Sequence, residues 1–554
     1  MERLVECVPN FSEGSDADVI RAITSAMERA GATVLDVDMG AAANRTVVTI
    51  AGTPEAVEEA AFQGIRVASE RIDMSRHHGE HPRLGATDVC PFVPLAGVTM
   101  AECVAMAGRV GQRVGSQLSI PVYLYDLAAT RPGRVSLADV RKGEYEGLAA
   151  KLADPEWLPD FGPAVFLPRS GATVIGAREI LIAYNVNLNT RERLLASRMA
   201  IRMREGGGPA RGSDGERLLD PTGEPLKVPG ALKAVRAVGW VIEEYGIAQV
   251  SVNLLDHKVT PLHAVYEEAK RQAAAVGVEV TGSEIVGLVP REALLTVGRH
   301  YLERQGLSPA APDGDLVHIA VRSLGLSDAR PFVAAEKIIE DRLAAGRTTL
   351  TGLTVREFTN RVSADAAVPG GGSVAALCGA LGAGLAAMVG NLTYRRPERE
   401  AERPLLKALA RKAQDLKARL TDLVTEDSEA FEAVMAAMRL PKGSDDEKAA
   451  RKVAMDLANE RATMVPFETL ERCLAVAELA HQAVAIGYEA CLSDAGAAAA
   501  AAQAGAEGAF LNVLINLKSV RGPEADERRR LASDHLQRVR MLVTESLGGV
   551  RNRL

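Results

Sequence analysis

The sequence predicts an α/β region in two strand-rich units, followed by an all-α helical domain. Three observations lead to this fold class. The first third of the 554 residues alternates β-rich stretches with helical patterns, which is typical of a layered α/β unit. A second strand-rich unit is expected to begin around Thr173–Asn189. From about Leu353 onward aromatic residues become rare, and the helix-forming residues Ala, Leu, Glu and Arg dominate.

The first unit is expected to contain short strands and one well-marked helix. Pro54–Arg71 is predicted as that helix, because proline is favoured in a first turn, where its missing N–H would have no partner. The predicted strands are Leu4–Val8, Thr33–Val37, Thr46–Ile50 and Pro121–Tyr125.

The second unit combines a buried sheet with a surface insertion. The apolar run Ile180–Val186 predicts a strand, and Gly206–Pro229, which is rich in Gly, Pro and charge, predicts a surface loop. The sheet is expected to continue at Val238–Ile242 and Ala248–Leu254, with a helix at Leu262–Ala275 and a helical connector at Ala334–Ala345.

The last two hundred residues are predicted to form helices that pack closely through small side chains. The apolar run Val374–Val389 is short of the roughly 20 residues that cross a bilayer, so we expect a buried interface helix and no membrane span. Pro466 is expected to bend or break one helix. The predicted helices are Val355–Ser363, Ser373–Asn391, Pro404–Met438, Ser444–Ile486 and Asp494–Leu517.

Composition narrows the classes of function. The net charge of −7 gives the whole chain no electrostatic reason to bind nucleic acid. The six cysteines are scattered without a CxxC pair, which is a poor disulfide or zinc framework and fits a reducing compartment. The beginning of the chain lacks an apolar signal run. We therefore expect a cytoplasmic protein.

Three of the nine histidines lie in one short segment, residues 77–82. Metal ligation, a structural role and acid–base chemistry are all open to such a cluster. Gly79 and Pro82 disfavour the continuous helix that would bring His77 and His81 to one metal ion. The pattern favours an acid–base site, because imidazole changes charge near neutral pH and charged neighbours follow at Glu80, Arg83 and Asp88.

Two glycine-rich regions are candidate ligand sites. The turns at Asp160–Pro163 and Pro168–Thr173 would let the backbone approach a flat ligand, but most such loops are plain turns. Pro369–Ser373 opens a helix, where exposed N–H groups favour an anionic ligand. A plain N-cap at Ser373 explains the same pattern. Neither region identifies a ligand by itself.

An acidic residue interrupts an apolar helical stripe in the helical domain. Asp427 occupies one position of this stripe, and a carboxylate on a buried face is costly unless it is paired or functional. An acid–base role and a structural pairing with an arginine are both open. The apolar members of the stripe are Leu420, Val424, Phe431, Val434 and Met438.

The whole chain resembles the formimidoyltransferase-cyclodeaminase family, the bifunctional enzymes of histidine breakdown. The resemblance begins at the opening segment Leu4–Gly14 and continues through His77–Phe92 and Asp160–Pro163. It ends with Pro369–Ala376 and Phe510–Leu517, and the segments follow the family's order. The chain departs from the animal pattern at the 206–229 insertion and at Thr393–Arg396, where a glycine usually follows the tyrosine.

The resemblance implies two activities and their residues. The transferase would comprise two α/β subdomains, residues 1–179 and 180–327, joined by a linker at 328–350 to an all-helical cyclodeaminase at 351–554. His81 would be the transferase acid–base residue, Asp38 a supporting carboxylate, and Asp427 the cyclodeaminase acid–base residue. The segment expected to contact folate is Gly162, Pro163, Ala164, Val165, Phe166, Leu167, Pro168, Arg169, Ser170 and Gly171.

The expected reactants are small molecules: tetrahydrofolate, as a substrate, with glutamate or formimino-glutamate. The chemistry requires no metal ion. Two alternatives stay open, a helical domain that is only a methenyltetrahydrofolate cyclohydrolase, and a scaffold that binds folate without turnover. A homo-oligomer through the helical domain is expected, because the small-residue helix Ser373–Asn391 and the alanines near Asp494 offer much close-packing surface.

A basic stretch in the helical domain suggests where a folate with several glutamates would bind. Each glutamate adds a negative charge, so longer tails are predicted to pass between the two sites more efficiently. A solvated helix face explains the same stretch, because glutamates interleave with its cations. The cations are Arg395, Arg396, Arg399, Arg403, Lys407, Arg411 and Lys412.

Overall fold

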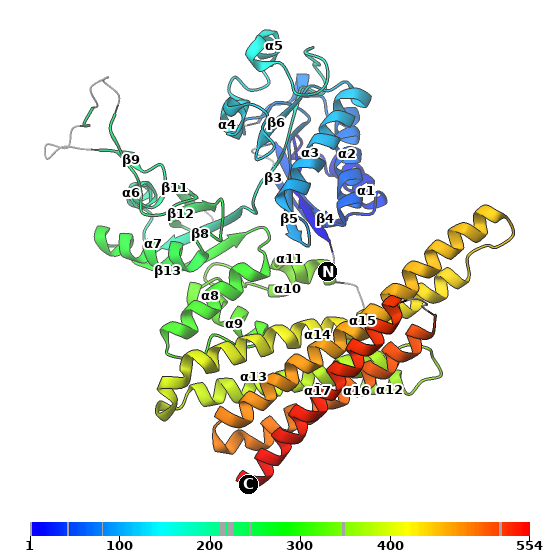
Figure 1. The fold of residues 1–554 in the computed structure, drawn as a ribbon. Coiled ribbons are helices and arrows are strands. Elements are labelled where there is room, and N and C mark those ends of the chain that lie inside the picture. Colours follow the sequence, from blue (N-terminus) through cyan, green and yellow to red (C-terminus); the bar gives the residue numbers. More distant parts are fainter. Residues whose placement is uncertain are drawn as a thin grey trace. The chain divides into compact units, whose positions relative to one another are not determined.

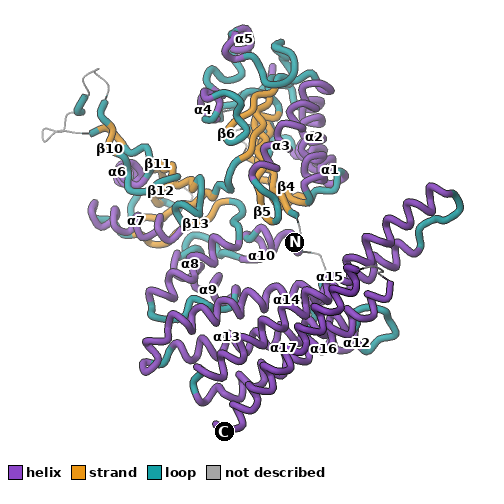
Figure 2. The backbone as a smooth tube through the Cα atoms, viewed as in Figure 1, coloured by secondary structure: helices purple, strands orange, loops and turns teal. Residues whose placement is uncertain are grey.

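The computed structural model describes residues 3–40, 44–79, 81–210, 217–219, 225–242, 245–345, 349–519 and 523–554. The chain divides into two compact units (Figures 1 and 2). One unit comprises Met1–Val297 and Ala320–Ala345, and the other comprises Gly298–Ile319 and Gly346–Leu554.

The first unit opens with a mixed sheet in which strands far apart in sequence are neighbours. β7 lies parallel between β5 and β6, and the other pairings are antiparallel. β1 and β2 both lie between β4 and β5, and β3 pairs with the outer side of β4. The strands are β1 (Leu4–Cys7), β2 (Asn10–Phe11), β3 (Thr33–Gly40), β4 (Arg45–Gly52), β5 (Thr87–Ala96), β6 (Val122–Asp126) and β7 (Thr173–Ala177).

Helices cover this first sheet. The helices α1 (Ala17–Arg29), α2 (Pro54–Arg71) and α3 (Met100–Arg113) supply the apolar residues of the core on one face (Figure 1). The opposite face packs against α4 (Leu137–Arg141) and α5 (Leu148–Ala153). The predicted strands and the predicted helix at Pro54–Arg71 are confirmed; Thr53 caps that helix and Pro54 occupies its first turn.

One expectation about the second strand-rich unit was wrong. Thr173–Ala177 is β7 of the first sheet, because this apolar segment pairs in parallel with β5 on one side and with β6 on the other. The second sheet begins instead at β8 (Ile182–Leu188). Its antiparallel order is β11–β12–β8–β13, with β11 at Val235–Ile242, β12 at Ile247–Leu254 and β13 at Val280–Val286.

The remaining elements of the α/β region surround the second sheet or follow it. The helix α6 (Arg193–Met203) packs on β11 and β12, and α7 (Leu262–Val276) packs on β8 and β13. Within the 206–229 insertion, β9 (Gly208–Pro209) pairs with β10 (Lys227–Val228), whereas residues 211–216 and 220–224 lie outside the described residues. The connector is helical, as predicted. It forms α10 (Ala334–Lys337) and α11 (Ile339–Ala344), after α8 (Arg291–Arg304) and α9 (Asp313–Leu324).

The helical domain confirms all five predicted helices and adds another. They are α12 (Val355–Val362), α13 (Gly371–Tyr394), α14 (Arg403–Met438), α15 (Asp445–Ile486) and α16 (Leu492–Asn516), followed by α17 (Pro523–Arg553), which the sequence patterns did not single out. Shorter turns of helix occur at Met74–Arg76, Val114–Leu118, Pro132–Arg134, Pro155–Trp157, Leu350–Gly352, Pro397–Glu402, Glu489–Cys491 and Leu517–Ser519.

Small residues let α13 and α16 approach closely, as expected. A Cβ atom on Gly505 would lie 2.7 Å from the carbonyl oxygen of Ala375, and one on Gly382 would lie 2.9 Å from that of Ala498. Two helical segments are long and apolar enough to cross a membrane by length and composition alone. They are α13, which has 24 residues, and Glu489–Asn516. Most of the apolar window of α13 is buried against neighbouring helices.

Pro466 does not end its helix. Helix α15 continues from Asp445 to Ile486 through the proline. Proline has no N–H to donate, so the carbonyl of Ala462, one turn earlier, loses its usual partner. The side-chain amide of Asn516 on α16 donates to that carbonyl at 2.6 Å. This replacement bond explains why the helix tolerates the proline.

Candidate active sites

The histidine segment and the glycine-rich loop, both identified from sequence, are joined in the first unit. The N–H of Ala86 donates to the carbonyl of Ser170 at 2.9 Å, and the N–H of Ala172 donates to that of Leu84 at 3.1 Å. Gly85 and Gly171 form a β-bridge between these bonds. The segment that carries the histidines is therefore held against the end of the 162–171 loop.

His81 presents one ring nitrogen for chemistry. Its Nδ1 lies 2.7 Å from the carbonyl oxygen of Pro82. The carbonyl of Pro82 can only accept from Nδ1, whereas the guanidinium of Arg45 can only donate to it, so the two contacts favour opposite tautomers. Among the described residues, Nε2 makes no hydrogen bond. Burial lowers the pKa of His81, and the positive charge of Arg45, whose Nη1 lies 3.1 Å from Nδ1, lowers it further. A neutral imidazole with an available Nε2 is suited to act as a base.

His77 has a structural role. Its side chain is buried, its Nε2 lies 2.9 Å from the carbonyl oxygen of Asn44, and its Nδ1 accepts from Nε of Arg83 at 3.2 Å. Both ring nitrogens are therefore occupied. Across the ranges that the structure describes, no group of three His, Cys, Asp or Glu side chains is arranged to hold a metal ion. Glu80, named above as a neighbour, lies outside those ranges.

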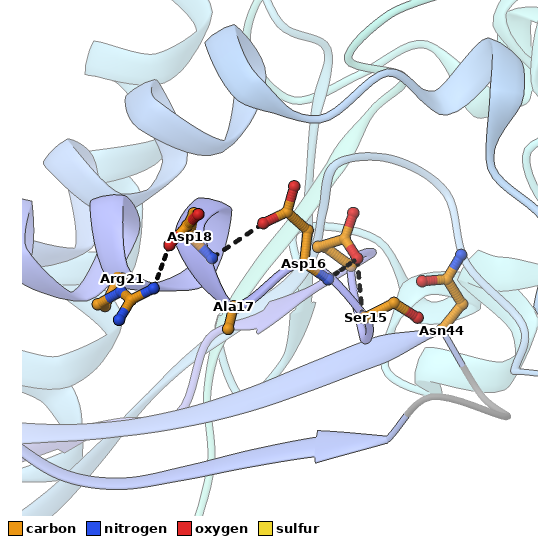
Figure 3. A pocket seen from close by; sticks show the side chains of 7 residues that line it. Ser15, Asp16, Ala17, Asp18, Arg21 and Asn44 are labelled. Carbon is orange, nitrogen blue, oxygen red and sulfur yellow. Dashed lines mark hydrogen bonds and ion pairs between the residues drawn. The ribbon is translucent and has the colours of Figure 1, made fainter.

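A surface pocket borders the histidine segment at the start of α1 (Figure 3). Asn44 connects the two: its side chain accepts from the N–H of Gly14 at 2.9 Å and donates to the carbonyl of His78 at 2.8 Å. The carboxylates at the pocket are engaged locally, because Glu13 accepts from two backbone N–H groups and Asp18 pairs with Arg21. Three carboxylates and one arginine line it, so it does not suit an anionic ligand.

A buried carboxylate organises the cations around His81. Asp88 has no exposed surface and accepts from Nη1 of Arg45 at 2.6 Å, from Nη2 of Arg141 at 2.5 Å and from the N–H of Leu84 at 3.0 Å. Asp88 was named from sequence as a charged neighbour, whereas the two arginines were missed. They come from β4 and α4, and no local motif marks either of them.

The 162–171 loop needs glycine at both ends. Gly162 has φ +81° and Gly171 has φ +63°, and a Cβ atom on either would lie within 2.4 Å of a backbone oxygen. Between them, Val165 is 56 % exposed. Tyr145 supports the loop, because its hydroxyl donates to the carbonyl of Pro168 at 2.7 Å and its ring centroid lies 5.4 Å from that of Phe166. The loop thus offers exposed residues, including the apolar side chain of Val165.

Asp38 lies on β3 and is exposed. The register pairs it with Val47 of β4, two residues from Arg45, so Asp38 and Arg45 point to the same face of the sheet. This position is compatible with the supporting role implied by resemblance, but among the described residues no bond joins Asp38 to His81.

In the helical domain, Asp427 meets the glycine turn that opens α13. Its carboxylate accepts from the hydroxyl of Ser373 at 3.1 Å and also from the Ser373 backbone N–H. A Cβ atom on Gly372 would lie 2.1 Å from Oδ1 of Asp427, so only glycine allows this approach. Burial raises the pKa of Asp427, while the bonds from Ser373 oppose the rise. In the described part of the chain, no arginine or lysine pairs with Asp427, which disfavours the structural alternative.

A further polar group lies at the same helix end. The Nδ2 atom of Asn512 on α16 would lie 3.3 Å from a Cβ atom on Gly371, and this amide donates to the carbonyl of Gly508 at 2.8 Å. Ser428 shares a bond with Ser373 at 3.1 Å. The Phe510–Leu517 motif pointed to this region from sequence, but the pattern did not single out Asn512.

The apolar stripe around Asp427 is only partly buried, which corrects the prediction. Leu420 and Val424 are buried, but Phe431 is 41 % exposed and Met438 is 48 % exposed. The last turns of α14 and the first turns of α15 extend past the other described helices of this domain as a hairpin (Figure 1), which explains the exposure of Met438 at the end of α14. Other exposed apolar side chains on this hairpin are Leu440, Val453, Leu457 and Met464.

Comparison with known proteins covers both regions. Three family models match: the N-terminal subdomain of the formiminotransferase domain at residues 4–178, the formiminotransferase domain at 183–344, and formiminotransferase-cyclodeaminase at 354–534. The chain is 45% identical over 539 residues to a formimidoyltransferase-cyclodeaminase from Sus scrofa, covering 96% of each protein.

Two shorter relatives match the two regions separately. A glutamate formimidoyltransferase from Streptococcus pyogenes is 42% identical over 304 residues, which cover 55% of this chain and 94% of the relative. A methenyltetrahydrofolate cyclohydrolase from Methylorubrum extorquens is 36% identical over 201 residues, which cover 36% of this chain and 93% of the relative.

Proposed function

We infer the function of this chain from one premise: it belongs to the formimidoyltransferase-cyclodeaminase family. The similarity over nearly the full length carries this conclusion. The protein is an enzyme of histidine degradation with two activities. It transfers the formimino group between N-formimino-glutamate and tetrahydrofolate, and it cyclodeaminates 5-formiminotetrahydrofolate to 5,10-methenyltetrahydrofolate with release of ammonia. Folate is therefore a substrate.

For the transfer, we propose His81 as the acid–base residue. The amino group that attacks the formimino carbon must lose a proton, and N5 of the folate must gain one as it leaves. Nε2 of His81 would perform both tasks in turn. Its lowered pKa supports this role, as does the absence of a hydrogen bond to Nε2 among the described residues. Asp38 would support the site from the neighbouring strand, on the sheet face that also carries Arg45.

The folate would bind along the 162–171 loop. This proposal is supported by the exposed residues 162–165 and 168–169 and by the strand-like bonds that hold the loop against the histidine segment. Holding both reactants beside His81 would itself supply much of the rate, because it replaces a bimolecular encounter with a fixed geometry.

For the cyclodeamination, Asp427 would carry the proton. N10 attacks the formimino carbon and forms a new C–N bond, and its proton passes to the amino group on that carbon. Ammonia then leaves as the bond between this carbon and the amino nitrogen breaks, and the methenyl bridge between N5 and N10 remains. A carboxylate with a raised pKa, close to a helix N-terminus and without a cationic partner, suits this shuttle.

A cyclohydrolase reaction is the second candidate for the helical domain, because the Methylorubrum extorquens relative bears that name. Water would then be the attacking group, in place of the N10 amine. The decisive experiment supplies formimino-glutamate and tetrahydrofolate to the full chain and follows ammonia and the methenyl product together. Ammonia equal to methenyl product supports deamination. Accumulation of 5-formiminotetrahydrofolate without ammonia, together with hydrolysis of separately added methenyltetrahydrofolate, favours the cyclohydrolase. Affinity without turnover favours a binding scaffold.

The domain division is proposed as 1–179, 180–327, a linker at 328–350, and 351–554. The bounds of the three family models support the divisions near residues 180 and 350, whereas the formiminotransferase model continues to residue 344, through most of the proposed linker. The division by compactness is different, since Gly298–Ile319 groups with the helical domain. For localisation we propose the cytoplasm, because all six cysteines are free thiols.

The helical domain is proposed to associate with a second copy. The small-residue face of α13 is already buried against α16, so the surface first expected to form the interface is occupied within the chain. The exposed apolar side chains on the α14–α15 hairpin are better candidates. Sedimentation of the full chain tests this proposal: a fully active monomer would contradict it.

The basic stretch after α13 is proposed to hold the glutamate tail of the folate. Several of its cations are engaged, because Arg396 stacks on the ring of Tyr488 at 3.8 Å and Lys407 pairs with Glu303. Arg395 is better placed, since it lines a pocket of the helical unit together with Asn391 and His318. The tail proposal therefore rests mainly on Arg395.

A further inference from the structure

The surroundings of His81 carry an excess of positive charge. The guanidinium groups of Arg45 and Arg141 share one carboxylate, that of Asp88. One cation is therefore left uncompensated within this group. An excess cation at a partly buried site attracts an anion more strongly than one in open water, because the local dielectric constant is lower.

The two arginines differ in how fully their donors are occupied. Nε and Nη2 of Arg45 donate to Oδ1 of Asn10 at 3.0 and 2.8 Å, and its Nη1 donates to Asp88. Arg141 uses Nε and Nη2 on Asp88, at 3.4 and 2.5 Å. Within the described residues its Nη1 has no bond, and its side chain is 14 % exposed. Arg141 thus keeps donors that can reach a ligand.

We propose that Arg141 binds the α-carboxylate of the glutamate or formimino-glutamate substrate beside His81, with Asp88 as the residue that positions Arg141. This inference rests on the proposed function, which places the transfer at His81. The α-carboxylate and the reacting nitrogen are attached to the same carbon atom, so an anchor for one fixes the other. A planar guanidinium with a free edge is the group that best matches a carboxylate.

The buried carboxylate of Asp88 also explains why the two arginines would have different roles. Asp88 is buried and accepts from both arginines and from the N–H of Leu84, so it holds both guanidinium groups in place. Arg45 acts on the imidazole through its charge, and Arg141 acts on the substrate. Anchoring of this kind would raise the affinity for glutamate with little effect on folate.

The test measures selectivity between two substrates. Formimino-glutamate is compared with N-formimino-4-aminobutyrate, which lacks the α-carboxylate, in the wild type and in Arg141→Gln. The wild type is expected to prefer formimino-glutamate by about 10- to 100-fold in kcat/KM, the usual range for a charged hydrogen bond. Arg141→Gln should lose this preference, mainly through a higher KM for formimino-glutamate, while KM for tetrahydrofolate stays within about twofold.

Lys142→Gln is the matched control. It removes the same charge from the next residue, which is exposed, and should keep the wild-type preference. Cyclodeamination of added 5-formiminotetrahydrofolate reports on folding of each variant. If Arg141→Gln does not fold, the wild type alone decides: equal use of both substrates overturns the proposal. A preference that survives in Arg141→Gln overturns it as well. A wrong assignment of His81 would be recognised separately, because the His81→Ala variant would then retain formimino transfer.

Discussion

The two proposed sites would move protons with different side chains, yet burial changes the pKa of both in the useful direction. Burial lowers the pKa of His81 and raises that of Asp427, because it disfavours whichever form is charged. The groups that surround His81 and Asp427 differ more in charge. His81 lies among cations held by Asp88, whereas Asp427 faces a serine and a helix N-terminus. The transferase site therefore suits an anionic amino acid, and the helical site suits a neutral proton shuttle.

The largest expected effect is at His81. His81→Ala should reduce formimino transfer by about 10²- to 10⁴-fold, the usual contribution of a general base. The helical domain should still convert added 5-formiminotetrahydrofolate at the wild-type rate. Both rates are measured on the same preparation, from glutamate formation and from the methenyl absorbance. His77→Ala does not serve as a control, because it would disturb the buried bonds to Asn44 and Arg83. Transfer at a near wild-type rate would remove His81 from its proposed role.

Sequence patterns predicted elements better than they predicted the partners within a site. Pro54–Arg71 could be predicted to its ends, since a cap and a proline mark its start. β7 was assigned to the wrong unit, because its place between β5 and β6 depends on pairings with distant residues. Arg45 and Arg141 were missed for the same reason. His81 and Asp427 could be proposed from sequence, because a histidine cluster and a break in an apolar stripe are local signals.

The converse variant is Asp427→Asn, which keeps the shape of the side chain but cannot act as a base. Ammonia release should fall by about 10²-fold or more, and formimino transfer should be unchanged. Circular dichroism and the retained transfer establish that the variant is folded. Ammonia release at the wild-type rate in such a folded variant would contradict the assignment of Asp427.

A smaller effect is expected at Gly372. A methyl group there would lie 2.1 Å from Oδ1 of Asp427, so Gly372→Ala should displace the carboxylate and slow cyclodeamination by about 10-fold. Gly384→Ala on the same helix is the matched control, because its Cβ would meet only Cδ of Lys417, at 3.9 Å. Equal rates in both alanine variants would show that the close approach to Asp427 is unimportant.

The smallest effect concerns the glutamate tail. With several glutamates on the folate, the lag before methenyl product appears should shorten by a few-fold relative to one glutamate, and less 5-formiminotetrahydrofolate should escape. Reversing Arg395, Arg396 and Lys407 to glutamate should abolish the difference at low salt, where charge attraction reaches furthest. An unchanged lag and escape after the reversal would reject the tail proposal.

The central claim is that two separate sites catalyse the two reactions in sequence, and mixing the single variants tests it most directly. Neither purified His81→Ala nor purified Asp427→Asn should convert formimino-glutamate and tetrahydrofolate to methenyltetrahydrofolate and ammonia. Mixed together, they should restore both products in equal amounts after a lag, because the intermediate made by one variant is consumed by the other. A mixture that stays inactive, although each variant retains its own remaining activity, would contradict the claim.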